Sequence, residues 1–340
     1  MKLVADIGGT HARFALLDAS GAPTQIQNLK TADFQNLTDA MKTYLGEGKR
    51  AVAWRAGELS AVVSIAAPLS NDRVKMTNAA WDFSIQKTQS NVGLKSLRLV
   101  NDFEALALAV PTLQADELAA VGHDLPLDTR LTKAILGPGT GLGMAGVMPV
   151  TTNGKTTWYA MPCEGGHASV AATNEREALL LQSAWKFAYE TSGASHSKTH
   201  ESVPAHCCWE SLLSGTGLPL LHRAVCLTDG FDYEVRTAEQ IGFGALKEKS
   251  PPCVATLATF CELLGSAAGD LALMMGARGG VYIKGGVLDR MLEMDLNFFK
   301  HSKFRERFEA KGAYAGYLQA IPTWFIKTPQ LALRGCATLL

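Results

Sequence analysis

Residues 6–13, with the sequence DIGGTHAR, lie between the apolar runs 3–5 and 14–17. This pattern predicts a strand, a tight glycine turn and a second strand. Two adjacent glycines allow backbone N–H groups to approach an anion closely, and Asp6 at the strand end can hold a hydrated metal ion. The segment therefore suits the phosphates of a magnesium-bound nucleotide. An ordinary Gly-Gly hairpin is the alternative.

A second glycine-rich segment repeats this order further along the chain. Residues 134–136 are apolar, residues 137–143 have the sequence GPGTGLG, and residues 144–148 are again mostly apolar. Two such hairpins indicate an internally duplicated architecture. Residues 141–146 also satisfy the G-x-G-x-x-G pattern. A dinucleotide-binding loop should open a helix, whereas this sequence continues as a strand, so we reject that interpretation.

The length and charge of the chain limit its fold and its partners. Its 340 residues exceed the roughly 250–300 at which single hydrophobic cores stop growing, so we expect two domains. Hydrophobic residues make up 47%, and 32 basic side chains balance 32 acidic ones. Because the net charge is zero, no broad positive electrostatic potential attracts nucleic acid or an anionic membrane. We expect neither as a partner.

We expect a soluble, cytoplasmic protein. Asp6 interrupts the N-terminal segment before an export signal could form, and no later stretch offers about 18 uncharged apolar residues. The seven cysteines contain no C-x-x-C pair, which favours a reducing compartment. His200-Glu201 begins like a zinc-protease helix, but the second histidine position holds Pro204. We therefore predict no metal ion held directly by protein ligands.

The remaining patterns predict alternating strands and helices, followed by a strongly helical second half. Strands are expected at 2–7, 12–18, 61–66, 97–100 and 280–284. Helices are expected at 103–110, 175–190, 206–213, 218–227, 237–248, 252–276 and 288–299. The apolar stripe of the helix at 252–276 indicates a core helix. Residues 191–205, rich in Ser, Thr, His and Gly, are expected to form a surface excursion.

Several polar residues lie beside predicted turns. Asn101 and Asp102 stand where a strand ends and a helix begins, where open α/β sheets present catalytic groups; a helix cap is the alternative. Glu164 and His167 flank two glycines, so both can face one small ligand, unless the segment is a surface turn. Glu210 alone would be a solvated charge. Together these acceptors and mixed donors suit a polyhydroxylated ligand such as a sugar.

In these motifs the chain resembles the bacterial-type glucokinases, which belong to the superfamily of sugar kinases, heat-shock-70 proteins and actin. The resemblance covers nearly the whole length. The matching segments are residues 6–13, 67–68 with 76–81, 99–103, 137–143, 164–167, 210 with 213–215, and 279–286. The chain departs from the family pattern at Pro138, at Thr216, where Pro is frequent, and in the tail 329–337.

The resemblance implies roles for individual residues. Those expected to contact glucose are Asn78, Asn101, Asp102, Glu164, His167 and Glu210. Among them, Asp102 would be the general base for the 6-hydroxyl. Those expected to lie against the nucleotide are Asp6, Gly8, Gly9, Thr10, Gly139, Thr140, Gly141, Gly285 and Gly286, the last two near the adenosine. Mg²⁺ would be reached from Asp6 through water, so ATP and Mg²⁺ are the implied cofactors.

The implied fold is α/β, with two ribonuclease-H-like domains of actin-like ATPase type around a central cleft. We expect a small domain from 1 to 112, completed by 327–340, and a large domain from 113 to 326. The implied reaction converts ATP and D-glucose to ADP and D-glucose 6-phosphate. Phosphorylation of another hexose, a sugar-responsive regulator on the same fold and an actin-like ATPase are the alternatives, and a homodimer is left open.

Overall fold

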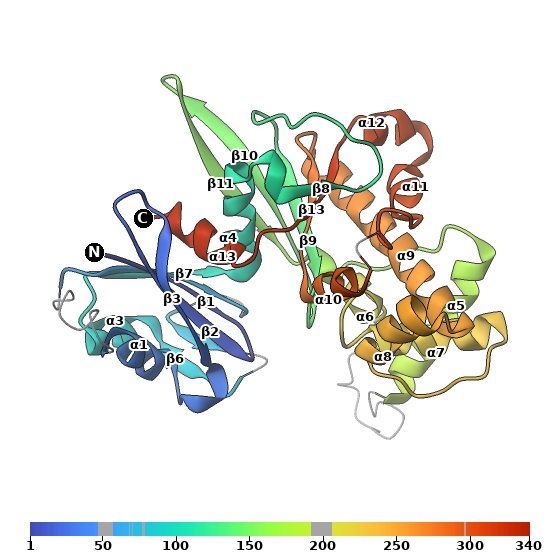
Figure 1. The fold of residues 1–340 in the computed structure, drawn as a ribbon, viewed down its shortest axis with the longest axis horizontal. Coiled ribbons are helices and arrows are strands. Elements are labelled where there is room, and N and C mark those ends of the chain that lie inside the picture. The colour runs from blue at the N-terminus through green and yellow to red at the C-terminus, as the bar shows by residue number, and fades with distance from the viewer. Residues whose placement is uncertain (47–56, 68, 70, 77–78, 192–205, 296) are drawn as a thin grey trace. The chain divides into compact units, whose positions relative to one another are not determined.

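The computed structural model describes residues 1–46, 57–67, 69, 71–76, 79–191, 206–295 and 297–340. The chain divides into two compact units (Figure 1). The first unit comprises Met1–Gln114, Val147–Pro162 and Thr328–Leu340, and the second comprises Ala115–Gly146 and Cys163–Lys327. The division into domains expected from the sequence stays a prediction.

A five-stranded sheet forms the centre of the first unit. Its strands lie in the order β3 (Pro23–Lys30), β2 (His11–Leu17), β1 (Lys2–Ile7), β4 (Ser60–Ile65) and β7 (Ser96–Asn101). Strands β1, β4 and β7 run parallel, whereas β2 is antiparallel to both of its neighbours. The carboxyl ends of the three parallel strands therefore meet at one edge of the sheet.

Helices cover both faces of this sheet because apolar side chains alternate along its strands. Leu3, Ala5 and Ile7 pack with α1 (Leu37–Gly46) and α3 (Ile85–Val92). On the opposite face, Val4 packs in a cluster with side chains of α4 (Asp102–Ala109) and α13 (Leu331–Ala337). A short hairpin of β5 (Arg73–Lys75) and β6 (Asp82–Ser84) completes the unit.

The sheet of the second unit has the strand order β11-β10-β9-β12-β13-β8. Its strands are β8 (Leu118–Ala120), β9 (Lys133–Pro138), β10 (Leu142–Thr152), β11 (Lys155–Cys163), β12 (Val281–Ile283) and β13 (Thr323–Ile326). Strands β9, β12 and β13 run parallel. The parts of β10 and β11 within residues 147–162 are grouped with the first unit.

Helix α9 (Pro251–Met275) lies at the centre of the second unit and contributes Phe260, Leu264 and Ala268 to its main apolar core. Among the described helices it alone is long and apolar enough to cross a membrane, but 72% of its most apolar window is buried inside the protein. It is therefore a core helix. The other helices of the unit are α5 (Glu175–Thr191), α6 (Trp209–Leu212), α7 (Leu218–Asp229), α8 (Ala238–Phe243), α10 (Gly286–Met294), α11 (Phe304–Glu309) and α12 (Ala315–Gln319).

Most predicted elements are confirmed within one or two residues. The helix predicted at 237–248 is α-helical only over α8 and continues as a π-helix over Gly244–Glu248. Two other predicted helices are shorter than expected. The one at 206–213 is reduced to α6, because Cys208 instead pairs with Ser169 in an isolated β-bridge. The one at 288–299 begins at Gly286 and ends at Met294. The predicted surface excursion at 191–205 lies outside the described residues, apart from Thr191 at the end of α5.

Candidate active site

The first glycine-rich loop connects β1 to β2. Asp6 and Arg13 are paired across these antiparallel strands, and Arg13 Nη1 donates to Asp6 Oδ2 at 3.2 Å. Ser64, the neighbour of Asp6 on β4, donates from Oγ to Asp6 Oδ1, also at 3.2 Å. Burial raises the pKa of Asp6 by more than Arg13 and Ser64 lower it. The carboxylate at the end of β1 is thus held by two donors on neighbouring strands.

The turn of this loop is fixed by its own backbone. Gly8 N donates to His11 O at 2.9 Å, and Thr31 holds the loop from outside, with N donating to Thr10 O and Oγ1 to Gly8 O, both at 3.0 Å. The amide of Gly8 is therefore used within the turn. In the described part of the chain, the amides of Gly9 and Thr10 have no such hydrogen bond. These two N–H groups are the ones left for an anion.

Asn101 and Asp102 lie at the carboxyl end of β7, at the same sheet edge as Asp6. Asn101 is the N-cap of α4 and accepts from Phe103 N at 2.9 Å, so the helix-cap alternative describes part of its role. Both side chains are partly exposed. Strand β4 lies between β1 and β7. The strand ends that carry Asp6 and Asp102 are therefore two strand spacings apart, about 10 Å in total. Asn78 lies outside the described residues.

The second glycine-rich loop connects β9 to β10 and is held by hydrogen bonds. Gly139 N donates to Gly141 O at 2.8 Å, which closes the turn. Leu142 N donates to Glu210 Oε2 at 2.7 Å. A Cβ at position 141 would collide with this carboxylate, so the close approach requires glycine. Glu210 is therefore bonded to the loop backbone and is not the solvated charge that its position on a short helix alone would suggest.

The pair Gly285-Gly286 lies beside this loop because β12 runs parallel to β9. Lys284 N donates to Leu136 O at 3.1 Å, and α10 begins at Gly286. A Cβ on Gly285 would collide with the backbone of Pro138, so glycine is required here too. The structure thus brings together the two segments that the sequence assigned to nucleotide binding in this half of the chain.

A cavity of about 440 Å³ is lined by residues of both segments, the second glycine-rich loop and the start of α10. Its lining residues are Gly139, Thr140, Gly215, Thr216, Ala238, Glu239, Gly242, Gly286, Val287, Arg290, Met291 and Met294. Its glycines come from the loop, the segment before α7, α8 and the start of α10, while its apolar side chains come mainly from α10. Val287, Met291 and Met294 of α10 therefore give this cavity an apolar wall, which suits a flat ring.

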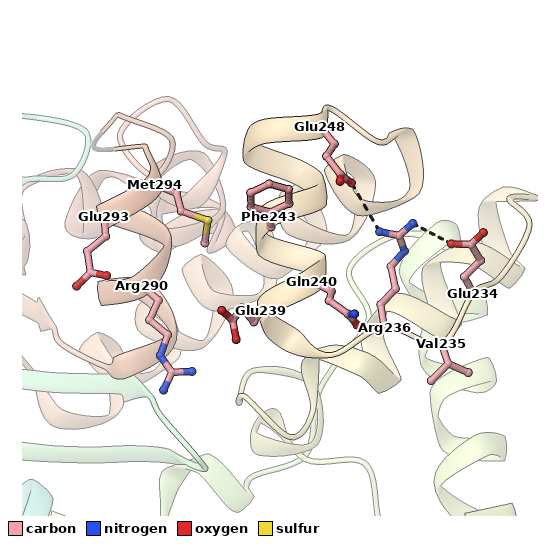
Figure 2. Close-up of a pocket in the computed structure, with 10 residues that line it drawn as sticks. All are labelled: Glu234, Val235, Arg236, Glu239, Gln240, Phe243, Glu248, Arg290, Glu293 and Met294. Carbon is pink, nitrogen blue, oxygen red and sulfur yellow. Dashed lines mark hydrogen bonds and ion pairs between the residues drawn. The ribbon is translucent and has the colours of Figure 1, made fainter.

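A larger cavity of about 770 Å³ shares Glu239, Arg290 and Met294 with the first one (Figure 2). Within it, Arg236 is paired with Glu234 at 2.8 Å and with Glu248 at 3.9 Å. Arg290 on α10 differs, since its guanidinium has no hydrogen bond or ion pair with any described residue. An unpaired cation thus stands where the two cavities meet, one turn into the helix that follows Gly285-Gly286.

Glu164 and His167 flank a single turn of 3₁₀ helix, in which His167 N donates to Glu164 O at 3.0 Å. Both side chains are exposed. The turn is tied to the start of α6, because Trp209 N donates to Ala168 O at 3.1 Å and His167 Nδ1 lies 3.9 Å from Cys208 Sγ. The turn and Glu210 therefore belong to one folded segment of the second unit.

The described residues contain no group of three or more His, Cys, Asp or Glu side chains that could hold a metal ion. All seven cysteines are free thiols, and burial raises the pKa of Cys207 to about 11 and that of Cys261 to about 12. Such thiols are poor metal ligands and poor nucleophiles at neutral pH.

Comparison with known proteins identifies the family. The model of the glucokinase family matches residues 3–340. The chain belongs to the glucokinase family. A glucokinase from Chromobacterium violaceum is 43% identical over 338 residues, which cover 99% of this chain and 88% of that relative. One from Paramagnetospirillum magneticum is 40% identical over 339 residues, covering 100% and 97%. The crystal structure of a glucokinase from an Antarctic psychrotroph matches with a TM-score of 0.80 at 32% identity, covering 100% and 98%.

Membership of the glucokinase family confirms the resemblance seen in the sequence, and the solved glucokinase confirms the predicted α/β fold class of actin-like ATPase type. Sequence reasoning missed Ser64, Thr216 and Arg290 as candidate site residues. The one available signal was the position of Arg290 in the first turn of the helix predicted at 288–299, four residues after Gly286.

Proposed function

We propose that the protein is a glucokinase that transfers the γ-phosphoryl group of ATP to the 6-hydroxyl of D-glucose, giving ADP and D-glucose 6-phosphate. The observation that carries the proposal is the family match over residues 3–340, with glucokinases at 43% and 40% identity over nearly the whole chain. Two glycine-rich loops at the ends of parallel strands support it, since phosphoryl transfer depends mainly on positioning and charge neutralisation.

Asp102 acts in this proposal as the general base that accepts the proton of the 6-hydroxyl. A positioned base contributes about 10² to 10⁴ in rate. Asn101 Oδ1 is used in the helix cap, so its amide N–H₂ is the part that remains to donate to a sugar oxygen. Glu164, His167 and Glu210 pair further hydroxyls, and Asn78 is proposed from the family resemblance.

The nucleotide lies, in this proposal, with its phosphates at the two glycine-rich loops. Gly8 shapes the first loop, and Gly9 and Thr10 present amides; Gly139, Thr140 and Gly141 form the second. The adenosine occupies the cavity of about 440 Å³ that is lined by Gly286 and by residues of α8 and α10. Arg290 lines this cavity and pairs with the nucleotide.

Mg²⁺ fits the residues of the first loop. This ion keeps several waters and uses one or two carboxylates together with substrate phosphates. Asp6 offers one carboxylate at the loop, and both of its oxygens already accept from Arg13 and Ser64, so contact through water suits it better than direct ligation. When bound, Mg²⁺ neutralises charge on the phosphate oxygens. We further propose a soluble cytoplasmic protein without nucleic-acid or membrane partners, and a homodimer that light scattering can test.

A coupled assay for ADP and for sugar phosphate tests the proposal. With ATP and Mg²⁺, we expect rapid turnover with glucose and much slower turnover with mannose, fructose and N-acetylglucosamine. A different preferred hexose would reassign the substrate. Glucose binding without turnover would indicate a sugar-responsive regulator, and ATP hydrolysis independent of any sugar would indicate an actin-like ATPase.

A further inference from the structure

Three hydrogen bonds join the second glycine-rich loop to the segment 210–217. Leu142 N donates to Glu210 Oε2 at 2.7 Å. Gly215 N donates to Gly139 O at 2.8 Å, and Thr216 Oγ1 donates to Thr140 O at 3.1 Å. Three positions of the loop, 139, 140 and 142, are therefore hydrogen-bonded to one short segment, which begins at the predicted sugar-binding residue Glu210.

The Thr216 end of this segment is rigid. Ser214 is fully buried; its Oγ lies 3.1 Å from Thr216 Oγ1 and accepts from Gly217 N at 2.9 Å. Leu218 N donates to Ser214 O at 2.9 Å, which joins the turn to α7. Thr216 thus holds the loop through contacts that involve no predicted sugar ligand.

The Glu210 end differs, because one of its two carboxylate oxygens is not used in the contact with the loop. Oε2 takes the bond from Leu142, while Oε1 has no hydrogen-bond partner among the described residues. Glu210 is partly exposed and lines a cavity of about 510 Å³ together with Ser211 and Thr216. A carboxylate can accept on both oxygens at once. One side chain can therefore bind the loop and a ligand hydroxyl together.

We propose that Glu210 couples sugar binding to nucleotide binding. This inference rests on the proposed function. A glucose hydroxyl that donates to Oε1 orders the Glu210 side chain, and Oε2 then holds the Leu142 amide and the phosphate loop in one position. A nucleotide that binds afterwards does not bear that ordering cost, so its affinity rises. The effect is reciprocal, since ATP must raise the affinity for glucose by the same factor.

Calorimetric titration with AMP-PNP and Mg²⁺, without glucose and with saturating glucose, tests the coupling. In the unaltered protein we expect AMP-PNP to bind on the order of fivefold more tightly with glucose. Glu210→Gln retains the size of the side chain but loses the charge on both oxygens. In this variant the ratio of the two affinities should approach one, even when glucose is raised to saturate the weakened site. Glu210→Asp, too short to reach Leu142, should give the same result if Glu210→Gln folds poorly.

Thr216→Val is the matched control, because it removes a bond to the same loop without touching a sugar ligand. It should weaken AMP-PNP binding equally with and without glucose, so the ratio stays at the value of the unaltered protein, and Thr216→Ser should restore the affinity. An unchanged ratio in the Glu210 variants overturns the inference. If the unaltered protein binds no glucose, the proposed function fails as well. This outcome is recognised because neither the unaltered protein nor any variant then gives a heat of glucose binding in the calorimeter.

Discussion

Asn101 and Asp102 accept hydrogen bonds from one donor, the backbone N–H of Phe103, at 2.9 and 3.0 Å. Asn101 does so as the N-cap of α4, and Asp102 does so from the first turn. The first turn of the helix therefore orients the Asp102 carboxylate through its Oδ1 atom. The side-chain amide of an asparagine at this position can accept the same hydrogen bond. Asp102→Asn therefore removes the carboxylate without removing this contact.

Replacing Asp102 by Asn should remove the general base and leave the fold intact. The amide still accepts from Phe103 N, so we expect an unchanged unfolding temperature, whereas kcat with ATP and glucose should fall by about 10² to 10⁴. Glu104→Gln, two residues further along α4, is the control and should retain full turnover. A kcat near that of the unaltered protein would remove Asp102 from the chemistry.

Replacing Glu164 by Gln should weaken both glucose turnover and sugar discrimination. A site that pairs a hydroxyl rejects an analogue that lacks or inverts it, because buried polar groups would otherwise stay unpaired. We expect kcat/KM for glucose to fall by roughly 10²-fold and the preference for glucose over mannose to shrink. Steady-state kinetics on both sugars measure this. Equal losses on the two sugars would show that Glu164 supports the loop without reading the sugar.

Replacing Arg290 by Met should raise the KM for ATP and leave kcat nearly unchanged. A hydrogen bond to a charged group contributes about 1.5–3 kcal/mol, so the loss should be roughly tenfold or more. Arg236→Met is the matched control, since Arg236 lines the neighbouring cavity but is already paired with Glu234 and Glu248. If both variants show the same KM, Arg290 has no part in nucleotide binding.

The buried amine of Lys133 should make stability depend on pH. Burial lowers the pKa of Lys133 from 10.5 to about 8, with Nζ donating to Asp128 O and Leu131 O. Between these two pKa values the unfolded chain binds more protons, so the free energy of unfolding should rise as the pH increases from about 8 toward 10.5. Urea unfolding across this range should show the rise in the unaltered protein and not in Lys133→Met. If the free energy of unfolding changes with pH in the same way in both proteins, Lys133 does not cause the rise.

The elements that could be predicted are those with a strong apolar pattern. Strand β1 and helix α9 carry such patterns and were placed correctly. Strand β3, with the sequence PTQIQNLK, is an exposed edge strand and shows no apolar run, so it was missed. Helix α13 has only seven residues, too few for a clear period. In each missed case tertiary packing, and not local pattern, decides the structure.

The places of Asp6 and Asp102 in the fold were predictable because both lie at the carboxyl ends of strands with clear apolar patterns; their roles stay predictions. The bond between Leu142 and Glu210 was not predictable, because it joins residues 68 positions apart and depends on a close approach at Gly141. Arg290 could not be recognised from local pattern either, since an arginine on a surface helix is ordinary. Its interest comes from the absence of a partner among the described residues.

The last helix of the chain covers part of the first sheet to be synthesised. Ala332, Leu333 and Cys336 of α13 share an apolar cluster with Val4 and Val100. On the ribosome these strand residues emerge early, and the rest of the chain follows over roughly 10 to 50 s at about 5 to 20 residues per second. During that interval this face of the N-terminal sheet has only α4 packed on it and lacks the cover of α13. The nascent chain therefore exposes apolar surface that chaperones or neighbouring chains can bind. This surface is buried once residues 331–337 pack on it.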